Sequence, residues 1–259
     1  MIKSNIFNKR FIFSVGMTIL LLYSHRLFSQ SFKNDKLNVP ALTATYGFCL
    51  PMADLSDRYT IFSQAGSSFL MKFKSNITVS LEGLILFSNN YRGESPLRSI
   101  LNDNGTITNI HGDQTLFTLG MRGMQFQIKG GYIISKYSHN PNSGITLSAG
   151  AGFFQSKYWI DQRGQNTPQI MGEYVKGYDK MSNGFALTQF IGYTYFHNKN
   201  FLNVYAGIEF TEAWTKDRRV WDFALNRKND TKYNEIMTAF KVGFMIPFIR
   251  REAEGKYYY

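Results

Sequence analysis

Residues 236–248 read IMTAFKVGFMIPF, and this stretch decides the fold. Its even-numbered positions hold Ile236, Thr238, Phe240, Val242, Phe244, Ile246 and Phe248, and its odd-numbered positions hold Met237, Ala239, Lys241, Gly243, Met245 and Pro247. Successive side chains of a β-strand point to opposite faces, whereas a helix would mix these two sets. The stretch therefore predicts a strand with one apolar face and one mixed face.

Seven further stretches show the same kind of alternation on either side of turn residues. Together the eight predicted strands cover residues 39–50, 66–74, 76–88, 124–137, 145–160, 184–196, 201–214 and 234–248. Residues 77–87 are a clear case, because isoleucine, valine and leucine side chains on one face oppose threonine, serine and Glu82 on the other. Residues 185–196 resemble a strand too, but their two faces are hard to tell apart. We therefore expect an all-β protein with eight antiparallel strands.

The connections between these strands alternate in length. Residues 74–76, 138–144 and 197–200 are tight turns, whereas 51–65, 89–123, 161–183 and 215–233 are long and polar. Bacterial outer-membrane barrels combine short periplasmic turns with long outer loops. The spacing therefore predicts an eight-stranded, up-and-down transmembrane β-barrel in the outer membrane, with both ends of the mature chain in the periplasm.

A soluble, lipocalin-like barrel is the alternative, and its apolar faces would point inward instead of outward. Alternation alone does not distinguish the two, but the placement of aromatic residues favours the membrane. They gather near the predicted strand ends, as lipid-interface girdles require, at Tyr46, Phe87, Tyr91, Tyr132, Tyr137, Tyr158, Trp159, Tyr193, Tyr195 and Trp214. Outer-membrane lipid is accordingly an expected partner.

The first 29 residues are typical of an export signal. Lys3, Lys9 and Arg10 precede an apolar stretch at residues 11–24, and Ser29 marks a cleavage site before Gln30. The alternative is an uncleaved anchor helix, for which the apolar stretch is short. We expect a signal peptide at 1–29, a short periplasmic segment at 30–38, the barrel at 39–248 and a periplasmic tail at 249–259.

Composition excludes several functions. The formal charge is +11, but the basic residues are scattered, with no basic helix and no aromatic ribonucleoprotein motif. We expect no nucleic-acid partner and no cofactor, and a surface near anionic lipid headgroups accounts better for the charge. Cys49 is the single cysteine, so no internal disulfide is expected.

Five charged residues fall on the predicted lumen face and form a candidate charge network. They are Lys72, Glu82, Lys129, Glu209 and Lys241. Charges in a dry interior must pair, and neighbouring strands place Glu82 beside Lys129 and Glu209 beside Lys241. Because eight strands leave an interior filled by side chains, we expect ion pairs within the core and little conductance.

No catalytic constellation stands out, so we expect a protein that is not an enzyme. His111 and Asp113 form an isolated pair in a loop, and His139 and His197 lie in the short turns. The fourth long loop is the candidate partner-contact loop, with Arg218, Arg219, Trp221 and Phe223. Such a mixture suits anionic outer-leaflet sugars, a partner protein, or a solvated loop with rim aromatics.

Several segments resemble the outer-membrane β-barrel family typical of Bacteroidota. They are the end of the export signal at 28–30, residues 46–55 (YGFCLPMADL), 141–145 (PNSGI), 150–154 (GAGFF), 176–185 (KGYDKMSNGF) and the aromatic tail at 256–259. Within this family, the chain is similar to the small PorT-like barrels that accompany type IX protein secretion. The resemblance implies an accessory or structural subunit of an envelope complex with protein partners. A free-standing barrel whose outer loops bind a surface ligand or mediate adhesion is the alternative.

Overall fold

The computed structural model describes residues 36–136, 138, 140–161, 167–197 and 203–248. The predicted signal peptide, residues 30–35 and the predicted tail lie outside the described residues. Eight long strands are β1 (Val39–Ala53), β2 (Phe62–Lys72), β3 (Ile77–Ser88), β6 (Thr118–Ile134), β7 (Gly144–Asp161), β8 (Ser182–Tyr195), β9 (Asn203–Asp217) and β12 (Lys232–Pro247).

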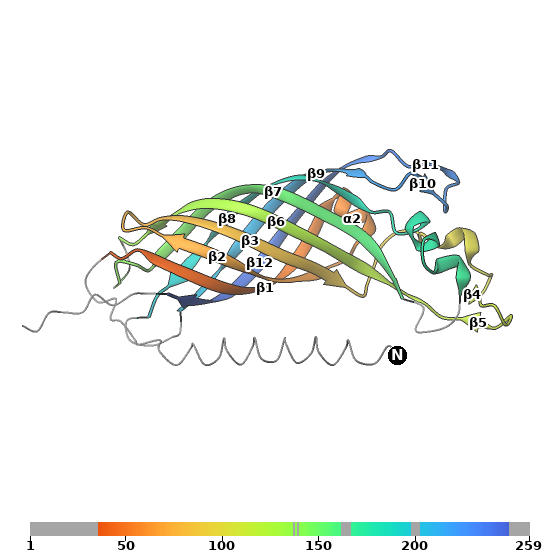
Figure 1. Ribbon diagram of the computed structural model, residues 1–259, viewed down its shortest axis with the longest axis horizontal. Helices are drawn as coiled ribbons and strands as arrows, with labels where there is room; N and C mark the ends of the chain where they lie inside the picture. Colours follow the sequence, from red (N-terminus) through yellow and green to blue (C-terminus); the bar gives the residue numbers. More distant parts are fainter. Residues whose placement is uncertain (1–35, 137, 139, 162–166, 198–202, 249–259) are drawn as a thin grey trace, which may run out of the picture.

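These strands form one closed antiparallel barrel. Each pairs with the next long strand along the chain, and β1 closes the ring by pairing with β12 from Ala41 opposite Pro247 to Ala53 opposite Glu235. The predicted eight-stranded, up-and-down barrel is therefore confirmed. Figure 1 shows the short turns at one end of the barrel, which we call the inner end. The long connections lie at the other end, which we call the outer end.

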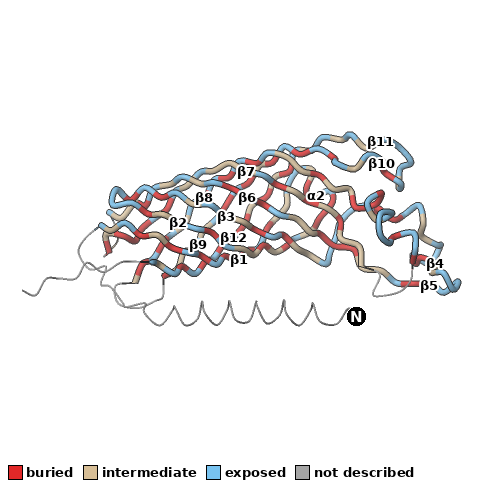
Figure 2. Tube along the Cα trace, viewed as in Figure 1, coloured by how far each residue is buried: buried red, intermediate tan, exposed pale blue. Residues whose placement is uncertain are grey.

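Apolar side chains point away from the barrel axis along every long strand, so exposed and buried residues alternate in Figure 2. On β12, Phe240 is 51% exposed and Val242 is 57% exposed, while Ala239 and Lys241 are each 1% exposed. A soluble barrel would not leave a continuous apolar surface in water. The lipocalin-like alternative is therefore wrong, and the outside of the barrel is built to face lipid.

The strands extend further at the outer end than the alternation predicted. β6 begins at Thr118 instead of 124, and β9 ends at Asp217 instead of 214. The extra residues of β9 are polar or charged. In β6 the apolar Leu119 and Met121 are buried and opposite in parity to the exposed Met124 and Phe126, so the apolar alternation is broken there. Tyr158 departs from the predicted aromatic girdle, because its side chain is 5% exposed and packs inside the barrel against Tyr59.

The long connections contain short elements that the sequence did not predict. They are α2 (Asp54–Arg58), the 3-10 turns η2 (Arg98–Ile100), η3 (Pro168–Ile170) and η4 (Tyr174–Gly177), and two small hairpins, β4 (Ile107–Thr108) with β5 (Gln114–Thr115) and β10 (Trp221–Asp222) with β11 (Arg227–Lys228). Both hairpins lie at the outer end in Figure 1. Leu97, Ile107 and Ile170 join different loops in one small apolar cluster. Among the described residues, no helix has the length and apolar character to cross a membrane.

Candidate functional site

Four charged side chains from four strands meet inside the barrel, and we call them the lumen charge ring: Glu82, Lys129, Glu209 and Lys241. The Lys129 ammonium lies 2.6 Å from Glu82 Oε2 and 3.0 Å from Glu209 Oε2. The Lys241 ammonium lies 2.9 Å from Glu82 Oε1 and 3.0 Å from Glu209 Oε1. Each cation thus bridges both carboxylates, and the ring is electrically neutral.

The lumen charge ring is almost fully removed from water. The side chain of Lys129 is 11% exposed, and the other three are 1% exposed or less. Charges buried in this way need partners with good geometry, and removing one partner typically costs about 3–5 kcal/mol. The ring therefore ties β3, β6, β9 and β12 together across the lumen, beyond their backbone ladders.

Lys72 faces the lumen but does not belong to the network predicted for it. It lies four residues along β2 from Ser68, the register partner of Glu82, which corresponds to roughly 13 Å at the rise of an extended strand. Its ammonium donates instead to Asn142 Oδ1 at 2.9 Å and to the Leu37 carbonyl at 3.3 Å. Lys72 therefore secures the inner end of the barrel, and the five-residue network is wrong for this residue.

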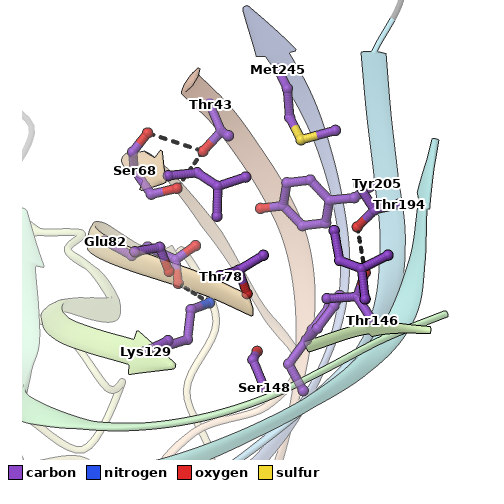
Figure 3. A pocket seen from close by; sticks show the side chains of 14 residues that line it. Thr43, Ser68, Thr78, Glu82, Lys129, Thr146, Ser148, Thr194, Tyr205 and Met245 are labelled. Carbon is purple, nitrogen blue, oxygen red and sulfur yellow. Dashed lines mark hydrogen bonds and ion pairs between the residues drawn. The ribbon is translucent and has the colours of Figure 1, made fainter. Parts of the chain in front are cut away.

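A small polar chamber of about 60 Å³ lies between the lumen charge ring and the inner end. Figure 3 shows Glu82 and Lys129 at its wall, with hydroxyl groups from several strands around it. Thr146 and Thr194 share a hydrogen bond of 2.6 Å, and Tyr205 projects its ring into the same space. The volume suits a few water molecules and is too small for an organic ligand.

Aromatic rings fill the lumen where neighbouring strands carry glycine. A Cβ atom on Gly243 would come 2.1 Å from Cε1 of Tyr205, and one on Gly207 would come 2.7 Å from Cζ of Phe190. The inner end is then closed by an apolar cluster of Val39, Ile133, Phe196 and Met245. Within the described residues, the lumen is therefore occupied by side chains on the inner side of the charge ring.

The outer end of the lumen is closed by a second buried cluster, the outer-end plug, formed by Arg58, Tyr59, Asp217, Tyr233 and Glu235. Arg58, the last residue of α2, reaches into the barrel and forms an ion pair with Glu235. Its guanidinium carbon lies 4.4 Å from the ring centre of Tyr233 and 5.3 Å from that of Tyr59. The Tyr233 hydroxyl donates to Asp217 Oδ2 at 3.1 Å, and burial raises the pKa of Tyr59.

The outer-end plug was not predicted from the sequence, although part of the signal was present. Glu235 lies in the predicted strand 234–248 and shares the parity of Lys241, so the alternation placed it on the lumen face. Asp217 shares the parity of Glu209 but lies beyond residue 214, where the predicted strand ended. Arg58 gave no such signal because it lies outside the strands, in a connection whose path follows no periodic pattern. Ser156 and Ser182 complete the site by donating to Glu235 Oε1 at 3.3 and 3.1 Å.

The candidate partner-contact loop is divided in the structure. Arg219 donates from Nε to Asp179 Oδ1 at 2.7 Å and forms an ion pair with the same carboxylate, which raises the pKa of Arg219. Phe223 packs edge-on against Tyr178, with ring centres 5.4 Å apart. These two residues attach the loop to the neighbouring connection between β7 and β8. The Arg219 side chain is thereby engaged, whereas Phe223 is still 39% exposed.

Trp221 and Arg218 remain exposed on the same loop, as the partner-contact interpretation requires. Trp221 is 44% exposed on β10, next to Val220, which is 79% exposed. Arg218 donates from Nε to Asn183 Oδ1 at 2.5 Å. The loop therefore presents a short stretch of apolar and basic side chains on a base that the neighbouring connection holds in place.

The fold does not gather the candidate catalytic and metal-binding side chains, which are the histidines, Asp113 and Cys49, into one site. His111 and Asp113 lie at the exposed tip of the β4–β5 hairpin, where both backbone N–H groups donate to Asn109 Oδ1 at 2.8 and 2.9 Å. This arrangement is a local turn. His139 lies outside the described residues, and His197 lies at the inner end. Cys49 is buried in the apolar cluster on the outer side of the charge ring. Among the described residues, no group of three or more His, Cys, Asp or Glu side chains is placed to hold a metal.

No protein-family model matches the chain, and no curated protein is similar to it in sequence. Several solved structures are similar in outline. Ail, the attachment invasion locus protein of Yersinia pestis, aligns with a TM-score of 0.43 and 10% identity over 82% of this chain and 99% of its own. Neisserial surface protein A gives 0.42 and 12% over 81% and 97%, and OprG of Pseudomonas aeruginosa gives 0.40 and 11% over 83% and 98%.

The assignment of the chain follows from its own geometry. The sheet is closed, so its strands leave no free edge and their backbone groups pair between neighbouring strands. Its outer face is apolar and its lumen is charged, hydroxylated and filled. The chain is an eight-stranded transmembrane β-barrel of the outer-membrane type.

Proposed function

We propose that this protein is a non-enzymatic outer-membrane barrel that works through its two ends, as an accessory or structural subunit of a larger envelope complex. The observation that carries the proposal is the closed lumen. The outer-end plug, the lumen charge ring and the inner apolar cluster block it at three levels of the described chain. A barrel blocked in this way offers no path for a solute, so its ends are the surfaces left for a function.

The outer end is suited to binding a protein partner, because its long loops are held to one another. The bidentate interaction of Arg219 with Asp179 and the packing of Phe223 on Tyr178 join two long connections. Above this base, Tyr174 is 65% exposed and Trp221 is 44% exposed. Tyrosine, tryptophan and arginine are enriched at protein interfaces, and a preorganised surface binds at lower entropic cost.

Type IX protein secretion is the assembly that we propose for this subunit. It rests on the resemblance of segments such as residues 46–55 and 176–185 to the PorT-like barrels. Residues 176–185 contribute Asp179 to the joined outer loops and Ser182 to the outer-end plug. The segment that carries the resemblance therefore helps to hold the proposed contact surface in place from below.

Cross-linking in intact cells, followed by mild detergent extraction, tests the proposal. We expect the protein to be recovered with the same envelope partners each time, and a deletion strain to secrete less protein. The double change Val220→Ser and Trp221→Ala should reduce the cross-links. Ile110→Ser is the matched control, because Ile110 is 53% exposed on the other hairpin. Recovery as a lone species together with normal secretion in the deletion strain would contradict the proposal.

The rival function is a free-standing barrel whose outer loops bind a surface ligand or mediate adhesion. Its support is the exposed basic side chains of Arg218, Arg227 and Lys228 around Trp221. It predicts that shortening the connection at residues 218–231 abolishes adhesion but leaves secretion intact. The cut must stay within these residues, because β9 continues to Asp217 and β12 starts at Lys232.

A further inference from the structure

An open groove runs along the outside of the barrel at the outer ends of β8, β9 and β12. We call it the rim groove, and Phe185, Trp214, Lys216, Arg218 and Lys232 lie along it. Strand register arranges its side chains in two rows. Lys216 lies between Asn183 of β8 and Lys232 of β12 in the outermost row, and Trp214 lies between Phe185 and Asn234 in the next.

The lower row of the rim groove is aromatic and faces the lipid. The rings of Phe185 and Trp214 stack with centres 6.2 Å apart and planes inclined by 15°. Phe185 is 53% exposed and Trp214 is 46% exposed. Aromatic side chains at this position along a membrane strand mark the boundary between acyl chains and headgroups. The upper row lies two residues further out, which is roughly 7 Å, and therefore at headgroup level.

The upper row is cationic, and its charges oppose one another. Lys216 and Lys232 are direct cross-strand partners, and like charges in this arrangement repel. Both side chains are exposed, and within the described part of the chain neither forms an ion pair with a carboxylate. Arg218 adds a third positive charge and is oriented by its bond to Asn183 Oδ1. A bound anion would relieve this repulsion.

Among the described residues, one carboxylate, that of Asp54, lines the rim groove itself. Asp54 accepts from the backbone N–H of Asn234 at 2.7 Å, and Glu212, one row nearer the membrane, accepts from the Asn234 side chain at 3.4 Å. Asp217 points into the lumen and accepts from Tyr233. The three basic side chains of the rim groove outnumber the Asp54 carboxylate, so the outer row keeps a net positive charge next to the headgroup layer.

We propose that the rim groove binds the phosphorylated headgroup of an outer-leaflet lipid. The phosphate lies between Lys216, Lys232 and Arg218, and the adjoining acyl chain runs down over Phe185 and Trp214. The groove lies on the outer wall of the barrel, so this site does not depend on the partner proposed above.

Native mass spectrometry of the full chain, released from detergent containing defined lipids, tests the site. Phosphatidic acid is the probe and phosphatidylcholine is the reference lipid. We expect Lys216→Gln with Lys232→Gln to weaken phosphatidic acid binding by about thirtyfold, because each surface lysine contributes about 1 kcal/mol toward an anionic lipid. The matched control is Arg227→Gln with Lys228→Gln, which removes the same charge from exposed positions on β11 outside the groove.

Any of three results would contradict the proposed site. They are phosphatidic acid binding unchanged in the lysine variant, a loss in the β11 control as large as in the lysine variant, or phosphatidylcholine binding as tight as that of phosphatidic acid. A further arm distinguishes a lipid from a free anion. Inorganic phosphate at millimolar concentration should not displace phosphatidic acid, and full displacement would reject the lipid in favour of a soluble anion. Both variants should show the same difference in gel mobility between boiled and unboiled samples as the wild-type barrel, which checks that they fold.

Discussion

The lumen charge ring and the outer-end plug are both buried ion-pair clusters, but they are built from different parts of the chain. The ring takes all four of its side chains from strands. The plug joins Glu235 of β12 to Arg58 of α2, which belongs to a connection. The closed sheet is therefore enough to position the ring, whereas the plug also needs α2 to fold back over the barrel. We expect the ring to govern global stability and the plug to govern the state of the outer mouth.

The largest expected effect comes from Lys241→Met. This change leaves Glu82 and Glu209 buried with only Lys129 between them, and we expect it to lower the free energy of unfolding by about 3–5 kcal/mol. Urea unfolding of the barrel in detergent, followed by tryptophan emission, measures it. The double variant with Glu209→Gln restores neutrality and should be less destabilised than Lys241→Met alone. Strictly additive losses would contradict a ring of coupled charges.

Arg58→Ala should have a smaller global effect, about 2 kcal/mol, since water can reach Glu235 once α2 moves. The main consequence is local: proteases should cut residues 54–61 faster than in the wild type. Arg58→Lys is the matched control, because it keeps a positive charge opposite Glu235 while it loses the guanidinium contacts with the rings of Tyr233 and Tyr59 and with Ser182. If Arg58→Ala destabilises the whole barrel as much as Lys241→Met, the division between ring and plug is wrong.

Arg219→Ala tests the joined outer loops and should cost about 1 kcal/mol or less, as expected for a partly exposed ion pair. The unfolding midpoint should hardly change, while proteolysis within residues 218–231 should accelerate. Asp179→Asn removes the other partner and should give the same pattern of cleavage. Protection equal to the wild type in both variants would show that other contacts hold these loops.

The smallest expected signal is electrical. In planar bilayers, the wild-type barrel should show no stable open-state current, because side chains fill the lumen. Arg58→Ala should remain closed as well, since the lumen charge ring lies below the plug and is left intact. A steady current through Arg58→Ala would mean that the plug alone closes the barrel.

The alternation of side chains was enough to predict the barrel and most of the ring. Once a strand is recognised, parity decides the face of each residue, and this placed Glu82, Lys129, Glu209 and Lys241 inside. Parity says nothing about height along the barrel, which is why Lys72 was assigned to the same network although it lies near the inner end. Height follows from strand register, and register needs the paired structure.

The outer end was harder to predict, for a different physical reason. Strands β9 and β12 continue there through polar residues such as Thr215, Lys216 and Lys232, whose backbone pairing leaves no apolar period in the sequence. The contacts that order its loops, such as Arg219 with Asp179, join residues 40 positions apart through connections of irregular path. The rim groove was invisible for the same reason, because only the register of β9 and β12 brings Lys216 opposite Lys232.

The central claim is that the barrel is apolar outside and filled inside, and nitroxide labels along β12 test it most directly. Each label would occupy one cysteine introduced between 237 and 244 in a Cys49→Ala background, since Cys49 is the only native cysteine. At 240, 242 and 244 we expect high accessibility to oxygen and low accessibility to a water-soluble nickel complex. At 237 and 239, whose native side chains are each 1% exposed, we expect low accessibility to both reagents. Strong collision with the nickel complex at 237 and 239 would reveal a water-filled lumen and contradict the account.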